Sequence, residues 1–154
     1  MNKRIKIVSL SAVMLCCFAS SSTAVAQQGT AEQAISGTPK DAQLKWSPCP
    51  AIFPKGCEVT VLRGNPADGP SDVFLRTPAN YKLPLHWHTS SERMILVAGE
   101  LHVTYEGQKP AVLRPGTYAY GPAKAKHQAR CANRGPCVLF IAFDSPIDAV
   151  LATN

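Results

Sequence analysis

The sequence has few charged residues, few aromatic residues and very few histidines. Charged side chains make up 17% of its 154 residues and aromatic side chains 7%, and the basic residues are scattered along the chain. Without a basic cluster, a nucleic-acid-binding surface is not indicated. No helical period of apolar residues is evident after residue 26, so a helical bundle is not expected.

The apolar run at residues 7–19 is too short for a membrane anchor, which needs about 20 apolar residues. A basic start at residues 3–6 precedes this run, and the cleavage pattern Ala24-Val25-Ala26 follows it. Residues 1–26 therefore resemble a signal peptide, and the mature protein would begin at Gln27 in the periplasm or outside the cell. Cleavage removes three of 16 basic residues and none of 10 acidic ones, which leaves 13 − 10 = +3.

No two cysteines have the C-x-x-C spacing that is typical of a cysteine metal site. After the signal peptide, four cysteines remain in two close pairs, Cys49 with Cys57 and Cys131 with Cys137. An exported chain favours disulfides. The sequence permits three connectivities, and we prefer the local one because each pair closes a short loop rich in Pro, Gly or Asn.

The rest of the chain is long enough for one domain with a substantial core. Residues 27–45 are small and polar and predict a flexible arm, which could instead pack on a partner subunit. Residues 46–146 predict the domain itself, and residues 147–154 a short tail with at most one helical turn. Within the domain, alternating apolar residues and frequent turns predict an antiparallel sandwich or barrel, with strands near 57–62, 73–76, 84–92, 93–97, 101–105, 111–113, 117–120, 128–131 and 138–143.

His86 and His88 are the strongest chemical signal. On a strand they share one face about 7 Å apart, with Trp87 on the other face. Glu92 lies four residues further on and keeps the same face if the strand continues without a bulge. Two imidazoles and a carboxylate could then share one cation, whereas the simpler interpretation is a pair of surface histidines and a solvated acid. His102 alternates with Leu101 and Val103 and is expected on the outer face.

The last two strands are expected to form a hairpin joined by Cys131–Cys137. This pairing would place Ala129 opposite Leu139 and His127 opposite Ile141, with an apolar cavity beside them. The residues expected to face this cavity, as core or as substrate contacts, are Met94, Leu96, Tyr118, Tyr120, Leu139, Ile141 and Phe143.

These residues together resemble the cupins, whose first motif is G-x5-H-x-H-x3,4-E-x6-G. It falls here on His86, His88, Glu92 and Gly99, with Asn80 in place of the first glycine. Asn tolerates the left-handed conformation that glycine supplies, so this departure is mild.

The second cupin motif, G-x5-P-x-G-x2-H-x3-N, falls on Gly116, Pro122 and His127. Lys124 replaces a glycine, which predicts an altered turn, and Cys131 replaces the asparagine. The resemblance covers residues 80–131 and implies an all-β, single antiparallel jelly-roll-like barrel with a metal inside. The ligands that it implies are His86, His88, Glu92 and His127.

Imidazole and carboxylate ligands suit Fe, Mn, Zn, Ni or Cu, and the ligand types do not choose among these divalent transition metals. Glu92 is the only plausible carboxylate for proton transfer. The leading hypothesis is dioxygenase-like chemistry on a small oxygen-rich organic molecule. A metal-dependent isomerase or decarboxylase and a non-catalytic periplasmic metal or ligand-binding module are the alternatives, whereas a zinc-bound anti-sigma cupin fits an exported chain poorly. The resemblance also implies a homodimer.

Overall fold

The structure is a computed structural model that describes residues 32–133 and 135–153. The predicted signal peptide lies outside these residues. In this part of the chain the regular elements are all strands: β1 (Ser47–Pro48), β2 (Glu58–Gly64), β3 (Ser71–Thr77), β4 (Lys82–Trp87), β5 (Glu92–Ala98), β6 (Leu101–Tyr105), β7 (Ala111–Leu113), β8 (Tyr118–Gly121), β9 (His127–Cys131), β10 (Cys137–Phe143) and β11 (Val150–Leu151). The described residues contain no helix long and apolar enough to cross a membrane.

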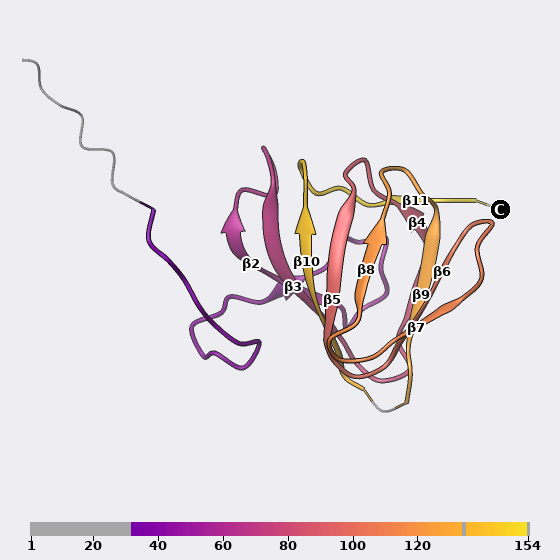
Figure 1. Cartoon of the computed structure of the whole chain (residues 1–154), viewed down its shortest axis with the longest axis horizontal. Coiled ribbons are helices and arrows are strands. Elements are labelled where there is room, and N and C mark those ends of the chain that lie inside the picture. Colours follow the sequence, from indigo (N-terminus) through magenta and orange to yellow (C-terminus); the bar gives the residue numbers. More distant parts are fainter. Residues whose placement is uncertain (1–31, 134, 154) are drawn as a thin grey trace, which may run out of the picture. The chain divides into compact units, whose positions relative to one another are not determined.

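The strands form two antiparallel sheets that enclose one core (Figure 1). One sheet has the order β1-β2-β3-β10-β5-β8 and the other has the order β11-β4-β9-β6-β7. Alternation along each strand turns one set of side chains inward: in β6, Leu101, Val103 and Tyr105 are buried, while the residues between them are half-buried. The predicted all-β jelly-roll barrel is therefore confirmed.

The two halves of the predicted hairpin belong to different sheets. Strand β9 lies between β4 and β6, whereas β10 lies between β3 and β5. The expected pairing of Ala129 with Leu139 and of His127 with Ile141 is therefore wrong, because Ala129 is paired with Leu83 and Val103, and Ile141 with Val73 and Met94. Local alternation predicts which face a residue occupies, but it does not select the neighbouring strand.

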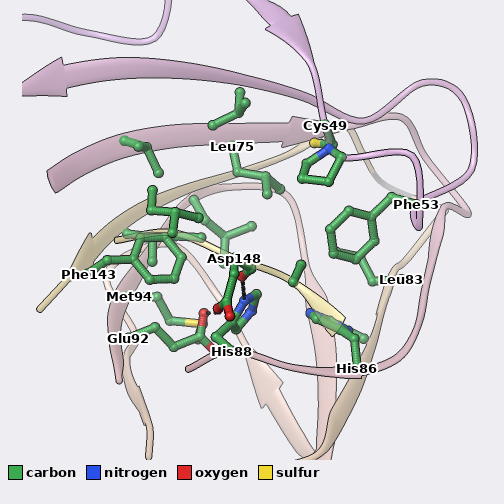
Figure 2. Close-up of a pocket in the computed structure, with 18 of the residues that line it drawn as sticks. Cys49, Phe53, Leu75, Leu83, His86, His88, Glu92, Met94, Phe143 and Asp148 are labelled. Atoms are coloured by element: carbon green, nitrogen blue, oxygen red, sulfur yellow. Dashed lines mark hydrogen bonds and ion pairs between the residues drawn. The ribbon is translucent and has the colours of Figure 1, made fainter. Parts of the chain in front are cut away.

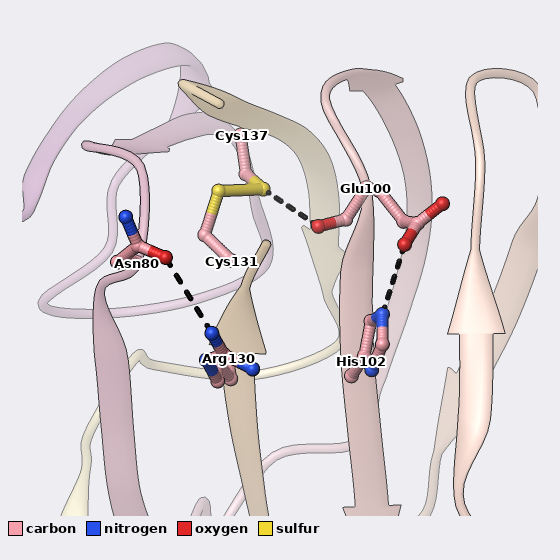
Figure 3. Close-up of a disulfide and its surroundings, with 6 residues drawn as sticks. All are labelled: Asn80, Glu100, His102, Arg130, Cys131 and Cys137. Carbon is pink, nitrogen blue, oxygen red and sulfur yellow. Dashed lines mark hydrogen bonds and ion pairs between the residues drawn. A yellow bond between two sulfur atoms is a disulfide. The ribbon is translucent and has the colours of Figure 1, made fainter. Parts of the chain in front are cut away.

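Both local disulfides are present, Cys49–Cys57 and Cys131–Cys137. The second joins the end of β9 to the start of β10, and so links the two sheets (Figure 3). Gly99 lies against this bridge with φ 86°, and a Cβ atom there would be 2.9 Å from the Cα atom of Cys137. His102 is half-buried beside Glu100, with its Nε2 atom 3.0 Å from a carboxylate oxygen (Figure 3), and it takes no part in the core.

The two residues that replace glycines of the cupin motifs keep the backbone conformation that glycine would adopt. Asn80 has φ 62° and Lys124 has φ 63°, both in the left-handed region. The altered turn expected at Lys124 is therefore not found. Its backbone N–H donates to the His88 carbonyl oxygen at 2.7 Å, which joins the second motif to the first.

The segments before β1 and after β10 differ in secondary structure. Residues 32–46 contain no strand or helix and are mostly exposed, although the Trp46 ring lies 4.0 Å below the Arg76 guanidinium. In contrast to the short tail expected from residue 147, Val150–Leu151 forms β11 and pairs with Trp87 and His86 on β4. The barrel thus extends past the expected boundary at residue 146, because the edge of β4 offers free backbone hydrogen-bonding groups.

Candidate metal centre

Three histidines converge inside the barrel. His86 on β4 and His127 on β9 are directly opposite each other in neighbouring strands, and His88 follows the end of β4. One ring nitrogen from each lies within 4.8 Å of the other two. Their exposed fractions are only 2%, 8% and 6% for His86, His88 and His127, respectively. Buried imidazoles gathered in this way are typical of a metal site.

Backbone carbonyl groups hold each imidazole in one orientation. The Nδ1 atoms of His86, His88 and His127 lie 2.7, 2.5 and 3.0 Å from the carbonyl oxygens of Pro84, Asp148 and Ala125. A carbonyl oxygen only accepts, so each Nδ1 carries a proton, and Nε2 is the atom through which each imidazole would bind a metal. This is the arrangement that metal-binding histidines use to fix their tautomer.

Glu92 approaches the histidines from the opposite sheet. The chain leaves β4 after Trp87 and enters β5, in the other sheet, at Glu92. Glu92 therefore does not share a strand face with His86 and His88, as the sequence predicts for an uninterrupted strand. The Glu92 carboxylate is nevertheless buried, with oxygens 3.8 Å from His88 Nε2 and 3.4 Å from His127 Nε2. The Tyr105 hydroxyl donates to the Glu92 Oε1 atom at 3.0 Å. A Cβ atom at Gly121 would lie 2.6 Å from this oxygen, so only glycine fits there.

Burial keeps two of the imidazoles neutral. Burial and the neighbouring His127 lower the pKa of His86 from 6.5 to about 3. Burial also lowers the pKa of His127, although the Glu92 carboxylate opposes this shift. The pKa of Tyr105 is raised by burial and by the Glu92 charge, so its hydroxyl remains a donor. Neutral imidazoles and a carboxylate fit a divalent transition metal.

A cavity of about 410 Å³ adjoins this cluster. Figure 2 shows His86, His88 and Glu92 at one side of the cavity and Leu75 at the opposite side. The Phe53 ring packs edge-on against the His86 ring, with 4.9 Å between centroids. The cavity provides space for an organic molecule beside the candidate metal ligands.

The predicted pocket residues divide into three groups. Met94, Leu139, Ile141 and Phe143 line the cavity, so their role as substrate contacts stays a prediction. Leu96 is fully buried in the core but does not line the cavity. The placement of Tyr118 and Tyr120 in the pocket is wrong, because these side chains are 59% and 52% exposed. On β8, it is Ala119 between them that is paired with Met94 and turned toward the core.

Sequence reasoning missed three groups that shape the site. Tyr105 alternates with Val103 along β6, so its inward direction could have been inferred. Phe53 lies in an irregular proline-rich segment that carries no periodic signal. Asp148 contributes a backbone carbonyl to His88, while its carboxylate accepts from the Thr89 N–H at 2.7 Å and from the Thr89 hydroxyl at 2.5 Å. Every residue has a backbone carbonyl, so the residue type at position 148 does not predict the contact with His88.

Comparison with known proteins agrees with this geometry. Residues 37–145 match the ChrR cupin-like domain family. The chain belongs to that family. A comparison with curated protein sequences gave no match.

Several solved cupin structures resemble this fold. The DMSP lyase DddQ from Ruegeria pomeroyi DSS-3 has a TM-score of 0.61 and 23% identity, over 71% of this chain and 61% of its own. An RmlC-like cupin from Shewanella frigidimarina NCIMB 400 has a TM-score of 0.56 and 24% identity, over 68% and 85% of the two chains. The cupin-2 domain Rru_A2000 from Rhodospirillum rubrum has a TM-score of 0.62 and 13% identity, over 80% and 84%. This cupin chain thus spans about three fifths of the lyase, and these likenesses establish the fold alone.

Proposed function

We propose that this chain is an exported cupin metalloenzyme with dioxygenase-like activity on a small organic substrate. His86, His88, His127 and Glu92 would hold one divalent transition metal. Solved cupins of similar fold include a DMSP lyase and an oxalate oxidase, so the fold is compatible with lyase and with oxidase chemistry. The observation that carries the proposal is the position of three oriented imidazoles and a carboxylate beside a cavity large enough for a substrate.

The donor set leaves room for chemistry. If the metal takes six ligands, binding by His86, His88, His127 and Glu92 would leave two positions open, enough for water, a substrate or dioxygen. A bound metal would supply Lewis acidity and, if it is iron or copper, electron transfer to dioxygen.

The chain's own residues would orient and protect the reacting groups. The carbonyl groups of Pro84, Asp148 and Ala125 hold the imidazoles, and the remaining cavity wall is lined by apolar side chains. Glu92 would hold a proton during the reaction, and the Tyr105 hydroxyl donates a hydrogen bond to the Glu92 Oε1 atom.

The activity is tested by measuring oxygen consumption in air with a broad panel of phenols and diketones. The mature protein is loaded in turn with iron, copper and zinc, and the metal-free protein is the control. We expect turnover with iron or copper and none with zinc or without metal. No turnover of any compound with any of the metals would refute the enzymatic proposal.

One observation favours a second candidate function, a module that binds metal and ligand without turnover. Apart from Glu92, the only acid that lines the cavity among the described residues is Asp148, and its carboxylate is engaged by Thr89. Equilibrium binding that returns the ligand chemically unchanged with every metal would support this module over the enzyme.

Export is part of the proposal. The two disulfides are expected in an oxidising compartment, which supports a periplasmic or secreted protein. N-terminal sequencing of the protein recovered from the periplasm tests this, and we expect the first residue to be Gln27. Recovery in the cytoplasm with residues 1–26 intact would contradict export.

A further inference from the structure

Among the described residues, the polar side chains that line the cavity are all at or next to the candidate metal centre. His86, His88, His127, Glu92 and Asp148 are the polar side chains in the lining, and the others belong to Pro, Cys, Phe, Val, Leu, Met, Ile and Ala. Among the described residues, no Lys, Arg, Asn, Gln, Ser, Thr or Tyr side chain lines the cavity. A ligand can therefore make polar side-chain contacts only at the candidate metal centre and its immediate neighbour Asp148.

This distribution of polarity restricts the ligand. A second carboxylate or a set of hydroxyl groups that is buried away from the metal would lose its hydration without gaining a side-chain hydrogen-bond partner, and a buried polar group without a partner costs about 1–3 kcal/mol, or more if it is charged. Both ionisable groups of the lining other than histidine are acids, and they would repel a second carboxylate. A dicarboxylate and a sugar are thus disfavoured.

Size adds a second restriction. The cavity of about 410 Å³ is near the lower end of the range of about 300–1,000 Å³ that holds organic ligands. By comparison with that range, the cavity suits a small organic ligand better than a large one. The lining residues Pro48, Pro50 and Val61 are exposed, so the apolar wall continues to the surface.

We propose that the ligand of this cupin has a single metal-binding head group attached to a small apolar body, in place of the oxygen-rich molecule expected from the sequence. This inference rests on the proposed metal site and specifies what it takes. The head group occupies the open positions on the metal, and the body lies against residues such as Leu83, Leu139 and Ile141.

The test uses the mature protein loaded with cobalt(II), whose visible spectrum reports on ligand binding without turnover. The probes share one head group: acetohydroxamate, hexanohydroxamate, octanohydroxamate and suberic acid monohydroxamate, which replaces the terminal methyl of octanohydroxamate with a carboxylate. Each fully buried methylene strengthens binding by up to about fourfold. We therefore expect hexanohydroxamate to bind at least about tenfold more tightly than acetohydroxamate, and suberic acid monohydroxamate at least about tenfold more weakly than octanohydroxamate.

A pair of variants tests whether the apolar cavity wall causes the weaker binding of suberic acid monohydroxamate. Val61 lines the cavity and is 43% exposed, so Val61→Arg adds a cation at the wall without burying it. Val97 is 39% exposed but does not line the cavity, so Val97→Arg is the matched control. Val61→Arg should relieve the penalty on suberic acid monohydroxamate, and Val97→Arg should not. Equal relief by both variants would assign the penalty to long-range charge and overturn the proposal.

Other outcomes separate this inference from the proposed function. If the protein takes up no cobalt, the proposed metal site fails and this inference fails with it. If cobalt and acetohydroxamate bind but affinity does not depend on chain length, only the proposed ligand class is refuted. Equal binding of octanohydroxamate and suberic acid monohydroxamate by the unaltered protein would also refute it.

Discussion

The two ends of the cavity differ in polarity and in what stabilises their side chains. At one end, His86, His88, His127 and Glu92 are buried together, which is costly unless each polar atom has a partner. At the other end, aliphatic side chains such as Leu83 and Leu139 line the wall and need only to be packed. The polar end offers donor atoms for a metal, whereas the apolar end contributes hydrophobic packing to the stability of the fold and would contact only the apolar body of the proposed ligand. Substitutions at the two ends should therefore impair different properties of the protein.

The largest effect is expected from removing two imidazoles of the polar end. The double variant His86→Ala and His127→Ala should lose stoichiometric metal, because two of four candidate ligands are gone. Metal analysis of protein purified from the periplasm measures this. His102→Ala is the matched control, since His102 lies apart from the cavity, and it should keep its metal. Retained metal in the double variant would refute the ligand assignment.

A substitution at the apolar end should reduce stability and leave metal binding intact. Leu139 is 3% exposed and lines the cavity, and Leu139→Ala should lower the free energy of unfolding by about 2–3 kcal/mol. Denaturant unfolding gives the stability, and metal analysis gives the stoichiometry. A loss of metal without a loss of stability would show that the two ends are not separable in this way.

Acid should destabilise the metal-free protein through the polar end. The pKa of His86 is lowered from 6.5 to about 3 by burial and by its neighbour His127, so the unfolded chain takes up a proton at a higher pH than the folded one. The stabilising contribution is complete above pH 6.5 and is lost as the pH falls towards 3. It amounts to about 2 kcal/mol between pH 7 and pH 5.

Unfolding of the metal-free protein in denaturant across this pH range measures the effect. The His86→Asn variant should show a shallower decline, because it lacks the group that titrates. An equally steep decline in the variant would assign the pH dependence to other residues.

The smallest effect, on metal affinity, is expected from changing Asp148, which helps to position His88. The Asp148 carboxylate accepts from Thr89, and its backbone carbonyl lies 2.5 Å from His88 Nδ1. Asp148→Ala should weaken metal binding by about tenfold, because it removes the bonds to Thr89 that hold in place the segment whose backbone carbonyl orients His88. Asp144→Ala is the control from the same segment, since Asp144 forms an exposed ion pair with Arg93. Equal weakening by both variants would show that the segment acts as a whole.

The strand positions and the candidate ligands could be predicted from the sequence because both signals are local. Alternation along residues 101–105 marks an inward face whatever the neighbouring strand. His86 and His88 share a face for the same reason, the spacing after His88 also points to Glu92, and the cupin motif adds His127. Even the departures Asn80 and Lys124 keep the backbone that the motif requires.

Other features could not be predicted because they depend on which strands meet. The expected hairpin of β9 and β10 fails because the disulfide between Cys131 and Cys137 bridges two sheets, a geometry that sequence spacing cannot tell from a hairpin. The sequence predicts Tyr118 and Tyr120 at the cavity, but the register of β8 with β5 turns Ala119 inward and leaves both tyrosines exposed. The pairing of β11 with β4 likewise depends on an open sheet edge.

The sequence by itself determined that this chain folds as an all-β barrel of the cupin type and that His86, His88, Glu92 and His127 belong to one motif set. Only the tertiary structure decided that Glu92 approaches from the opposite sheet, that backbone carbonyls orient the imidazoles, and that the adjoining cavity is apolar. The reason is physical: residue types and their spacing determine local conformation and the available donors, whereas the environment of each donor depends on contacts between distant segments.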